Sequence, residues 1–487
     1  MRYIAALDEG TTATRAVLFD LQSEKIVKSV SAEIKQYYPQ PSFVEEDAEE
    51  IYFKTREVLD EILDYADGDV AGVGVTNQRE TVVAWDAKSG RPLCNAIVWQ
   101  CRRTADFMAS LDKNTVETIR KKTGLLPDAY FSASKIKWLI DNVPQIKTKL
   151  EKGEVCFGTI DSYLIYRFTD GKSFVTDATN ASRTMLFNIN TLKWDEELLE
   201  IFGVPKSALP TVVPSDCVAG ETEYKGKKIP ICGIAGDQQA AVVGQCCFNK
   251  GECKATYGTG LFMLCNTGEK PVFSQKGLLT TIAYKLGDRT VYALEGSVFN
   301  AGSTVQWLRD GLEFFRRSEE CESLAVSVKD NGGVYLVPAF TGLGAPHWSS
   351  DARGMICGLT RGAGKAHITR AALESIAYSA KDLAEVMRSE NGEISVLRVD
   401  GGASANNFLM QFQADVLGEK VDKPCEKEST ALGAVYLCAL GLKILSFDKV
   451  AKMRKTERIY FPQKDREIYK KYYDEWLKAV ERCVYGK

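Results

Sequence analysis

One aspartate and one glycine-rich turn bring together the residue types that phosphoryl transfer needs. Asp237 follows an apolar run that ends at Ile231 and precedes the small-residue stretch 238–243, so we expect it at a helix start on the carboxyl side of a buried strand. Further along, Tyr257-Gly-Thr-Gly260 predicts a tight turn whose backbone N–H groups can face an anion. A carboxylate beside a phosphate-binding turn indicates a kinase-type site with Asp237 as its catalytic base.

A related turn opens the chain, in the run from Asp8 to Arg15. Gly10 permits the turn, and Thr11 and Thr12 offer hydroxyl and amide groups to phosphate oxygens. Asp8 is a suitable ligand for a hydrated Mg²⁺ ion. A single Gly-Thr-Thr turn is often only a turn, so the prediction depends on the recurrence of such a turn in each half of the chain.

A third glycine turn, Gly401-Gly402, joins a predicted strand to a predicted helix. Backbone without a side chain suits a flat adenine or ribose, although an ordinary helix-entry turn explains the two glycines equally well. The stretch Gly362-Ala-Gly-Lys365-Ala is not a P-loop, because its spacing is wrong and no Ser or Thr follows the lysine.

Polar residues that could hold a substrate follow another buried strand, at Arg79-Glu80. Such a pair on a loop is usually solvated, and Trp99 and Tyr130 taken alone would be core aromatic residues. On their own, Asp161 and the run 180–183 are assigned a structural role.

The composition is that of an ordinary globular protein. Its 487 residues favour two domains of roughly 200–250 residues each. A net charge of −3 argues against binding to nucleic acid or to an anionic membrane surface. The start of the chain does not resemble a secretory leader, and the longest apolar run, 431–442, is too short to span a bilayer. We therefore expect a cytoplasmic protein without membrane insertion.

Cysteine and histidine usage narrows the chemistry further. The 14 cysteines are expected to be reduced core residues, because the chain is long and has no predicted leader. With only two histidines and no Cys-x-x-Cys pair, neither a zinc site nor a histidine-based nucleophilic triad is expected.

Both halves alternate strands and helices, which predicts two similar α/β domains. In the first half we expect strands at 3–8, 13–20, 26–33, 70–76 and 81–86, and a helix that starts after Asp47. In the second half we expect strands at 291–294, 334–337 and 396–399, and helices near 300–312, 366–387 and 406–417. A last helix should dock Ile468, Tyr472, Trp476 and Val480 on the core. The join is placed near 244–251, which divides the chain into domains 1–246 and 247–487.

Two stretches are similar to signatures of the FGGY carbohydrate kinases: 130–142, and 354–359 followed by 367–374. Further runs resemble the members of that family that act on glycerol, namely 75–81, 95–104, 180–187, 233–239 and 340–346. The likeness extends from Tyr3 to about Leu442.

The resemblance implies an actin/hexokinase-type α/β fold, in which two RNase H-like domains face each other across a nucleotide cleft. It also implies transfer of the γ-phosphoryl group of ATP, with Mg²⁺, to glycerol in a homodimer or homotetramer. The N-terminal domain would bind the acceptor and carry the first phosphate turn and Asp237. The C-terminal domain would carry the second turn and bind adenosine.

The same resemblance implies a role for individual residues. Glycerol would be bound by Arg79, Glu80, Tyr130, Asp237 and Gln238, with Trp99 and Phe262 against its carbon atoms. The nucleotide would be bound by Thr11, Thr12, Ala13 and Arg15 from one half, and by Thr259, Gly302, Gln306, Gly402 and Asn406 from the other.

Two alternatives remain at this point. A pentulose or other polyol kinase of the same family would share the phosphate turns and Asp237 but bind a bulkier acceptor; Arg79-Glu80 favours glycerol. An ATP-switched scaffold of the actin or chaperone type would keep the turns but would have no use for Asp237.

Overall fold

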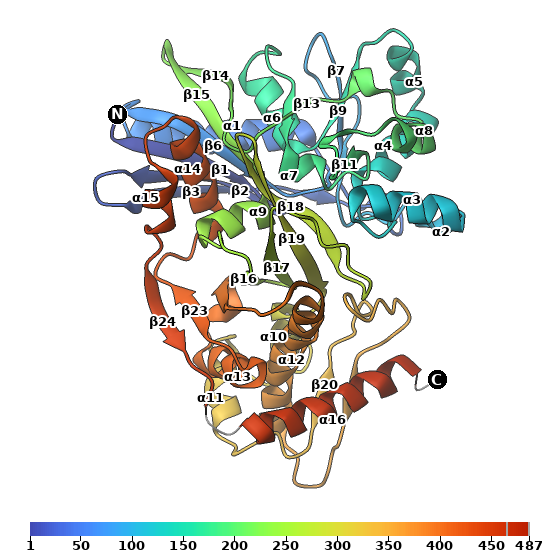
Figure 1. Cartoon of the computed structure of the whole chain (residues 1–487), viewed down its shortest axis with the longest axis vertical. Helices are drawn as coiled ribbons and strands as arrows, with labels where there is room; N and C mark the ends of the chain where they lie inside the picture. Colours follow the sequence, from blue (N-terminus) through green and yellow to red (C-terminus); the bar gives the residue numbers. More distant parts are fainter. Residues whose placement is uncertain (464–465, 486–487) are drawn as a thin grey trace.

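Two β-sheets, one built mainly from each half of the chain, organise the molecule (Figure 1). The computed structural model describes residues 1–463 and 466–485. The first sheet contains, in spatial order, β14 (Val218–Tyr224), β15 (Lys227–Gly236), β6 (Val70–Asn77), β1 (Tyr3–Glu9), β2 (Ala13–Asp20) and β3 (Lys25–Glu33). The second contains β18 (Leu279–Leu286), β19 (Arg289–Val298), β17 (Leu261–Gly268), β16 (Glu252–Tyr257), β22 (Val396–Asp400), β23 (Val421–Pro424) and β24 (Thr456–Tyr460).

The centre of the first sheet is parallel, because β6 pairs in the same direction with both β1 and β15. Strands buried on both faces read as continuous apolar runs, and β1 is such a run. Helix α1 (Ala48–Tyr65) covers one face, and Asp47 caps it by accepting hydrogen bonds from the backbone N–H groups of Glu49 and Glu50. The predicted strands and helix start of this region are confirmed.

The second half repeats the pattern of sheet and covering helices. Its core is packed by α10 (Gly302–Asp310), α12 (Lys365–Asn391), α13 (Asn407–Leu417) and α16 (Arg466–Tyr485). Asn406 caps α13, close to where the sequence predicts that helix to begin. The docking of α16 is only partly as predicted: Trp476 and Val480 are buried, but Ile468 is 42% exposed because its end of the helix lies outside the core.

One helix of the second half returns to the first sheet. Helix α14 (Ser429–Gly441) packs against α9 (Asp237–Gly244) and against β15, β1 and β6, and Figure 1 places it beside the blue strands. The first sheet is therefore covered by helices from both halves of the chain. The predicted division between residues 246 and 247 lies between α9 and β16 and stays a prediction.

Shorter elements connect these layers. The remaining strands are β4 (Gln36–Tyr37), β5 (Glu45–Glu46), β7 (Val83–Asp86), β8 (Ala96–Ile97), β9 (Val155–Gly158), β10 (Val175–Asp177), β11 (Phe187–Asn188), β12 (Lys193–Trp194), β13 (Thr211–Val213), β20 (Tyr335–Val337) and β21 (Met355–Cys357). The remaining α-helices are α2 (Ala105–Ala109), α3 (Lys113–Thr123), α4 (Ser132–Asn142), α5 (Pro144–Leu150), α6 (Ile160–Phe168), α7 (Ala178–Ala181), α8 (Glu196–Phe202), α11 (Glu320–Val326) and α15 (Phe447–Ala451).

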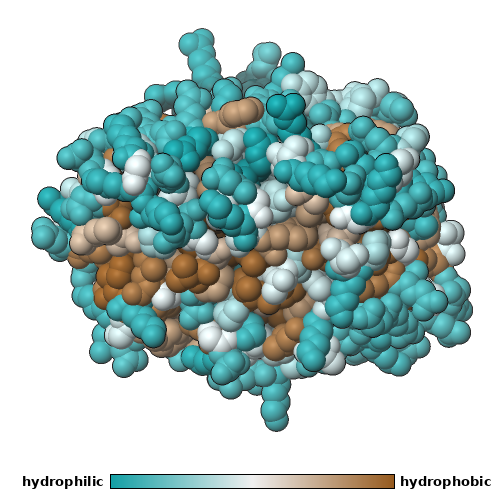
Figure 2. Space-filling model, turned by 90° about the horizontal axis from the view of Figure 1, so that it is seen from above, coloured by the Kyte–Doolittle hydropathy of each residue, from teal (hydrophilic) through white to brown (hydrophobic). Residues whose placement is uncertain are grey.

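The surface seen from above is mainly hydrophilic, with an apolar band across its middle (Figure 2). Within residues 1–463 and 466–485, none of the helices combines the length and the apolar character needed to cross a membrane.

Candidate active site

Asp237 is the first residue of α9 and directly follows the parallel strand β15, where the sequence places it. Its Oδ1 accepts a hydrogen bond from the backbone N–H of Gln238 at 2.7 Å, and its Oδ2 accepts one from the Gln238 side chain at 3.1 Å. Arg79 Nε lies 3.2 Å from Oδ1, and the Asp237 side chain remains 32% exposed. The carboxylate is thus held at both oxygens while part of the side chain stays exposed.

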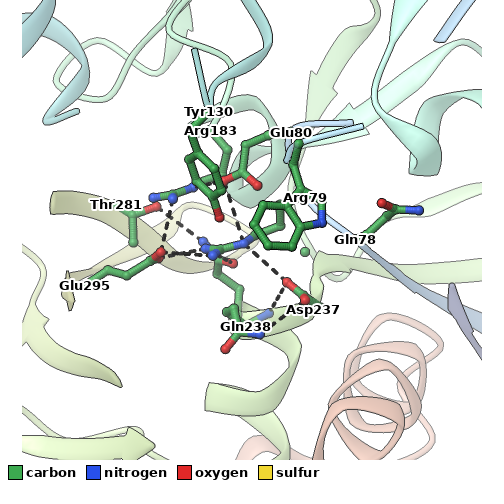
Figure 3. Close-up of polar contacts among 12 residues, drawn as sticks. Gln78, Arg79, Glu80, Tyr130, Arg183, Asp237, Gln238, Thr281 and Glu295 are labelled. Carbon is green, nitrogen blue, oxygen red and sulfur yellow. Dashed lines mark hydrogen bonds and ion pairs between the residues drawn. The ribbon is translucent and has the colours of Figure 1, made fainter. Parts of the chain in front are cut away.

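Arg79 and Glu80 lie beyond the end of β6 and are buried, so the alternative of a solvated surface pair is wrong. Arg79 donates from Nη1 and Nη2 to the two oxygens of Glu295, at 2.7 and 2.9 Å. Figure 3 shows its guanidinium group between Asp237 and Glu295. Because Glu295 takes both terminal nitrogens, the geometry does not offer the bidentate fork of Arg79 to a ligand.

Two charged residues that the sequence analysis did not assign to the site complete this cluster. Arg183, which follows α7, donates from Nε to Glu80 at 2.6 Å and from Nη2 to Glu295 at 3.0 Å. Glu295 lies within β19 and is fully enclosed. A charged residue inside an otherwise apolar strand was the available signal for Glu295, since such a group needs a partner when it is buried.

The positive charges of Arg79 and Arg183 balance the negative charges of Glu80 and Glu295. Burial alone would raise the pKa of Glu295, but the charges of Arg183 and Arg79 and the hydrogen bonds from Arg79 outweigh it and hold that pKa at about 2. Burial raises the pKa of Glu80, although Arg79 and Arg183 oppose the shift. Glu295 is therefore a permanent anion at working pH.

Trp99 and Tyr130 lie together in the same region, and Tyr130 also packs against a buried hydrophobic cluster. Their rings meet edge to face with centroids 5.5 Å apart. The indole Nε1 of Trp99 donates to Thr11 Oγ1 at 2.9 Å, which brings the first phosphate turn beside these rings. Lys135 supports the Tyr130 segment by donating to the carbonyl oxygens of residues 129, 130 and 131, and burial lowers its pKa to about 7.

Phe262 and Gln238 belong to elements that border Asp237. Phe262 is half-buried on β17, opposite Thr256 and Ser297. The Gln238 amide donates to Asp237 and accepts a bond from Lys254, a buried lysine that also donates to Thr256 Oγ1 at 2.9 Å. Burial lowers the pKa of Lys254, while Asp400 and Asp237 raise it.

The first phosphate turn is a tight hairpin between β1 and β2, closed by a hydrogen bond from Gly10 N–H to the carbonyl oxygen of Ala13 at 3.0 Å. Thr12 is exposed and Thr11 is half-buried, so both can meet a ligand. Arg15 donates to Glu428, which directly precedes α14.

Asp8 carries an unpaired carboxylate near this turn. Among residues 1–463 and 466–485, none donates a hydrogen bond to it or forms an ion pair with it at contact distance. Burial raises its pKa to about 7; the charge of Arg15 lowers that pKa, and those of Asp237 and Glu428 raise it further. A carboxylate in such surroundings favours a neighbouring cation. In the same described ranges, no group of three or more His, Cys, Asp or Glu residues is arranged for a metal ion.

The second phosphate turn borders a cleft of about 370 Å³. The structure brings all five residues that were predicted for the nucleotide in this half to its lining: Thr259, Gly302, Gln306, Gly402 and Asn406. Sequence analysis missed the wall contributed by α11 and the segment before it, which includes Ser318, Glu319, Cys321 and Glu322. No motif marks that wall.

A second hollow, of about 570 Å³, is open and lies elsewhere, between Asp216, Leu286, Arg289 and the segment 440–447. None of the predicted site residues lines it. The predicted site residues therefore lie outside this hollow.

Comparison with known proteins agrees with this geometry. Residues 3–244 match the N-terminal domain, and residues 253–442 the C-terminal domain, of the FGGY family of carbohydrate kinases. The chain is 52% identical to a glycerol kinase of Symbiobacterium thermophilum, over 99% of this chain and 98% of that one. It is 53% identical to a glycerol kinase of Pseudothermotoga lettingae, with the same coverage.

Solved structures give the same result. A Plasmodium falciparum glycerol kinase, crystallised with ADP, has a TM-score of 0.93 and 40% sequence identity, and the match covers 99% of this chain and 98% of that one. A xylulose kinase of Lactobacillus acidophilus has a TM-score of 0.90 at 24% identity, over 99% and 98% of the two chains, which speaks for the fold alone. The expected two-domain α/β fold is confirmed, and the chain belongs to the FGGY family of carbohydrate kinases.

Proposed function

We propose that the protein transfers the γ-phosphoryl group of ATP to glycerol and releases sn-glycerol 3-phosphate and ADP. The observation that carries the proposal is the cluster of Arg79, Glu80 and Asp237, which lies beside Trp99 and the Thr11 turn. Relatives named glycerol kinase, 52–53% identical over nearly the whole chain, support this acceptor over a pentulose.

A small polyol needs acceptors and donors for its hydroxyl groups and an apolar wall for its carbon atoms. Glu80 and Asp237 supply acceptors, and Arg79 supplies the donor that faces Asp237. Trp99, Tyr130 and Phe262 would supply the wall. Such a site rejects analogues that lack a hydroxyl, because the buried polar groups would lose their partners.

Asp237 is the proposed base. As the acceptor oxygen forms its bond to the γ-phosphorus, the bond from phosphorus to the bridging oxygen of ADP breaks, and the hydroxyl proton passes to a carboxylate oxygen of Asp237. Both oxygens of Asp237 already accept one hydrogen bond and keep further lone pairs free. Gln238 and Arg79 therefore orient the base without blocking it.

The two turns are the proposed phosphate sites. Thr11, Thr12, Ala13 and Arg15 would approach the phosphates from the first half. From the second half, Thr259, Gly302 and Gln306 would bind the nucleotide, and Gly402 and Asn406 would line the adenosine. Asp8 fits a hydrated Mg²⁺ ion, because a nearby cation would offset the burial and the neighbouring carboxylates that raise its pKa. Bound Mg²⁺ would neutralise charge on the phosphate oxygens.

The remaining parts of the proposal concern the whole protein. We expect domains 1–246 and 247–487, a homodimer or homotetramer, and a place in the cytoplasm.

An acceptor panel tests the function. Purified protein with Mg²⁺ and ATP is offered glycerol, dihydroxyacetone, xylulose or ribulose, and ADP release is followed by a coupled assay. We expect glycerol to give the highest kcat/KM. The Asp237→Asn variant should lose a factor on the order of 10² or more in kcat, as removal of a general base does, and should bind ADP as tightly as the wild type.

The two parts of this experiment fail separately. A pentulose preferred over glycerol would overturn the proposed acceptor. Turnover of the Asp237→Asn variant close to that of the wild type would reject Asp237 as the base, whichever acceptor is preferred.

A further inference from the structure

Glu295 connects the two sheets at the acceptor site. It belongs to β19 of the second sheet, opposite Leu264 of β17, yet its carboxylate meets two guanidinium groups from the first half of the chain. Three donors reach its two oxygens: Arg79 Nη1 at 2.7 Å, Arg79 Nη2 at 2.9 Å and Arg183 Nη2 at 3.0 Å. The side chains of Glu295, Arg79 and Arg183 are all at most 2% exposed.

The contacts form a closed ring of alternating charge. Glu295 binds Arg79 and Arg183, Arg183 binds Glu80 at 2.6 Å, and Glu80 lies 3.8 Å from Arg79 Nε. Two positive and two negative charges cancel within the ring, which buried charges require. Figure 3 shows that the ring is continued by Asp237, which Arg79 Nε approaches at 3.2 Å.

The ring determines how Arg79 is oriented. Because a guanidinium group is planar and its hydrogens are fixed in that plane, two bonds from Nη1 and Nη2 to one carboxylate set the direction of Nε. That direction leads to Asp237. Glu80 is held by a single hydrogen bond from Arg183, and its backbone φ of 62° leaves it few other conformations.

We propose that Glu295 and Arg183 are positioning residues for the acceptor: a carboxylate of the second half holds Arg79, and through Arg183 also Glu80, in the orientation that binds the substrate hydroxyl groups. This proposal rests on the proposed function and deepens it. Recognition of the acceptor hydroxyl groups then depends on a contact between the two halves, although the polar residues that would bind those groups belong to the first half.

Kinetic measurements on a Glu295→Gln variant test the proposal. An amide keeps the shape of the side chain but can no longer accept hydrogen bonds at both of its terminal atoms. We expect the KM for glycerol to rise about tenfold or more, since a buried charged partner is lost. The Kd for ADP should stay within about twofold of the wild-type value, because the nucleotide cleft lies outside the ring. The preference for glycerol over propane-1,3-diol, as a ratio of kcat/KM values, should fall.

Glu252→Gln is the matched control. Glu252 is also a buried carboxylate of the second sheet that is bound to an arginine, Arg398 at 3.1 Å, and it has no contact with the ring. A general effect of removing a buried charge would appear in both variants. We expect the wild-type KM for glycerol in the control.

Wild-type KM and wild-type selectivity in a Glu295→Gln variant that binds ADP would overturn the proposal. If that variant does not bind ADP, Glu295→Asp replaces it: the charge remains, but the shorter side chain cannot reach both arginines, so the KM should still rise. A wild-type KM in Glu295→Asp would then count against positioning. If the wild type itself prefers another acceptor, the proposed function fails and the ring is tested with that acceptor.

Discussion

At the residue scale, the first phosphate turn is backed by a buried pair of carboxyl groups, Glu9 and Glu46. The Gln78 side-chain amide bridges them, with its nitrogen 3.3 Å from Glu9 Oε1 and 2.7 Å from Glu46 Oε2. The other Glu9 oxygen is buried and has no partner within the described part of the chain. Burial raises the pKa of Glu46 to about 7 and that of Glu9 well above its ordinary value, and Glu46 raises the latter further. The pair therefore favours a bound proton.

Glu9→Gln should stabilise the protein in a pH-dependent way. Because the pKa values of the pair are higher in the folded state, the native protein retains protons that the unfolded chain has released, and wild-type stability falls as pH rises from about 4.5 through 7. The amide removes the part of that loss that is due to Glu9. We expect a gain in the free energy of unfolding at pH 8 that shrinks toward zero near pH 4.5. Urea denaturation at several pH values measures it.

Glu33→Gln provides the control for this prediction, because Glu33 is an exposed carboxylate on strand β3 of the same sheet. It should leave the pH profile of stability unchanged. A gain for Glu9→Gln that is equal at pH 5 and pH 8 would show that ionisation of the pair is not the cause.

At the element scale, α9 and α14 touch through their backbones. A Cβ atom added at Gly433 would lie 1.8 Å from the carbonyl oxygen of Ala240, and one added at Gly244 would lie 1.9 Å from that of Ser429. Only glycine allows this approach at either position. The first residue of α9 is Asp237, so the packing of these helices also positions the proposed base.

Gly433→Ala should therefore destabilise the protein by about 2 kcal/mol or more, because a close-packed interior cannot absorb the added methyl group without moving a helix. The loss is measured as a change in urea midpoint. Gly364→Ala is the control: its φ is −119°, and no atom lies within 4 Å of the added Cβ. Equal stability of the two variants would mean that α14 can shift at little cost.

At the scale of the whole molecule, the proposed acceptor and nucleotide sites take residues from both sheets. We expect glycerol together with a nucleotide to draw the two halves closer, exclude water from Asp237 and limit ATP hydrolysis. Small-angle scattering should record a smaller radius of gyration with both ligands than with neither. The Asp237→Asn variant is used for the measurement because its turnover should be slower. Profiles that do not change on addition of both ligands would argue against closure.

The local sequence pattern was enough to predict much of the fold and the position of Asp237. The position of Asp237 follows from an apolar strand and a run of small residues, and the glycine turns could be located because few other sequences permit such turns; their role as phosphate sites stays a proposal. Arg183 and Glu295 could not be paired in this way, since they are 112 residues apart and become partners only when β19 meets the first half. The return of α14 to the first sheet is a long-range contact of the same kind.

The hydrogen bond between Trp99 and Thr11 determines the role that the Thr11 oxygen plays. An indole nitrogen can only donate, so the oxygen of Thr11 must accept there, and its own hydrogen is free to turn toward another acceptor. In the proposed site, the threonine hydroxyl would thus present a donor to an incoming nucleotide. The aromatic side chain proposed to border one substrate would thereby set the hydrogen-bonding polarity that the other substrate meets.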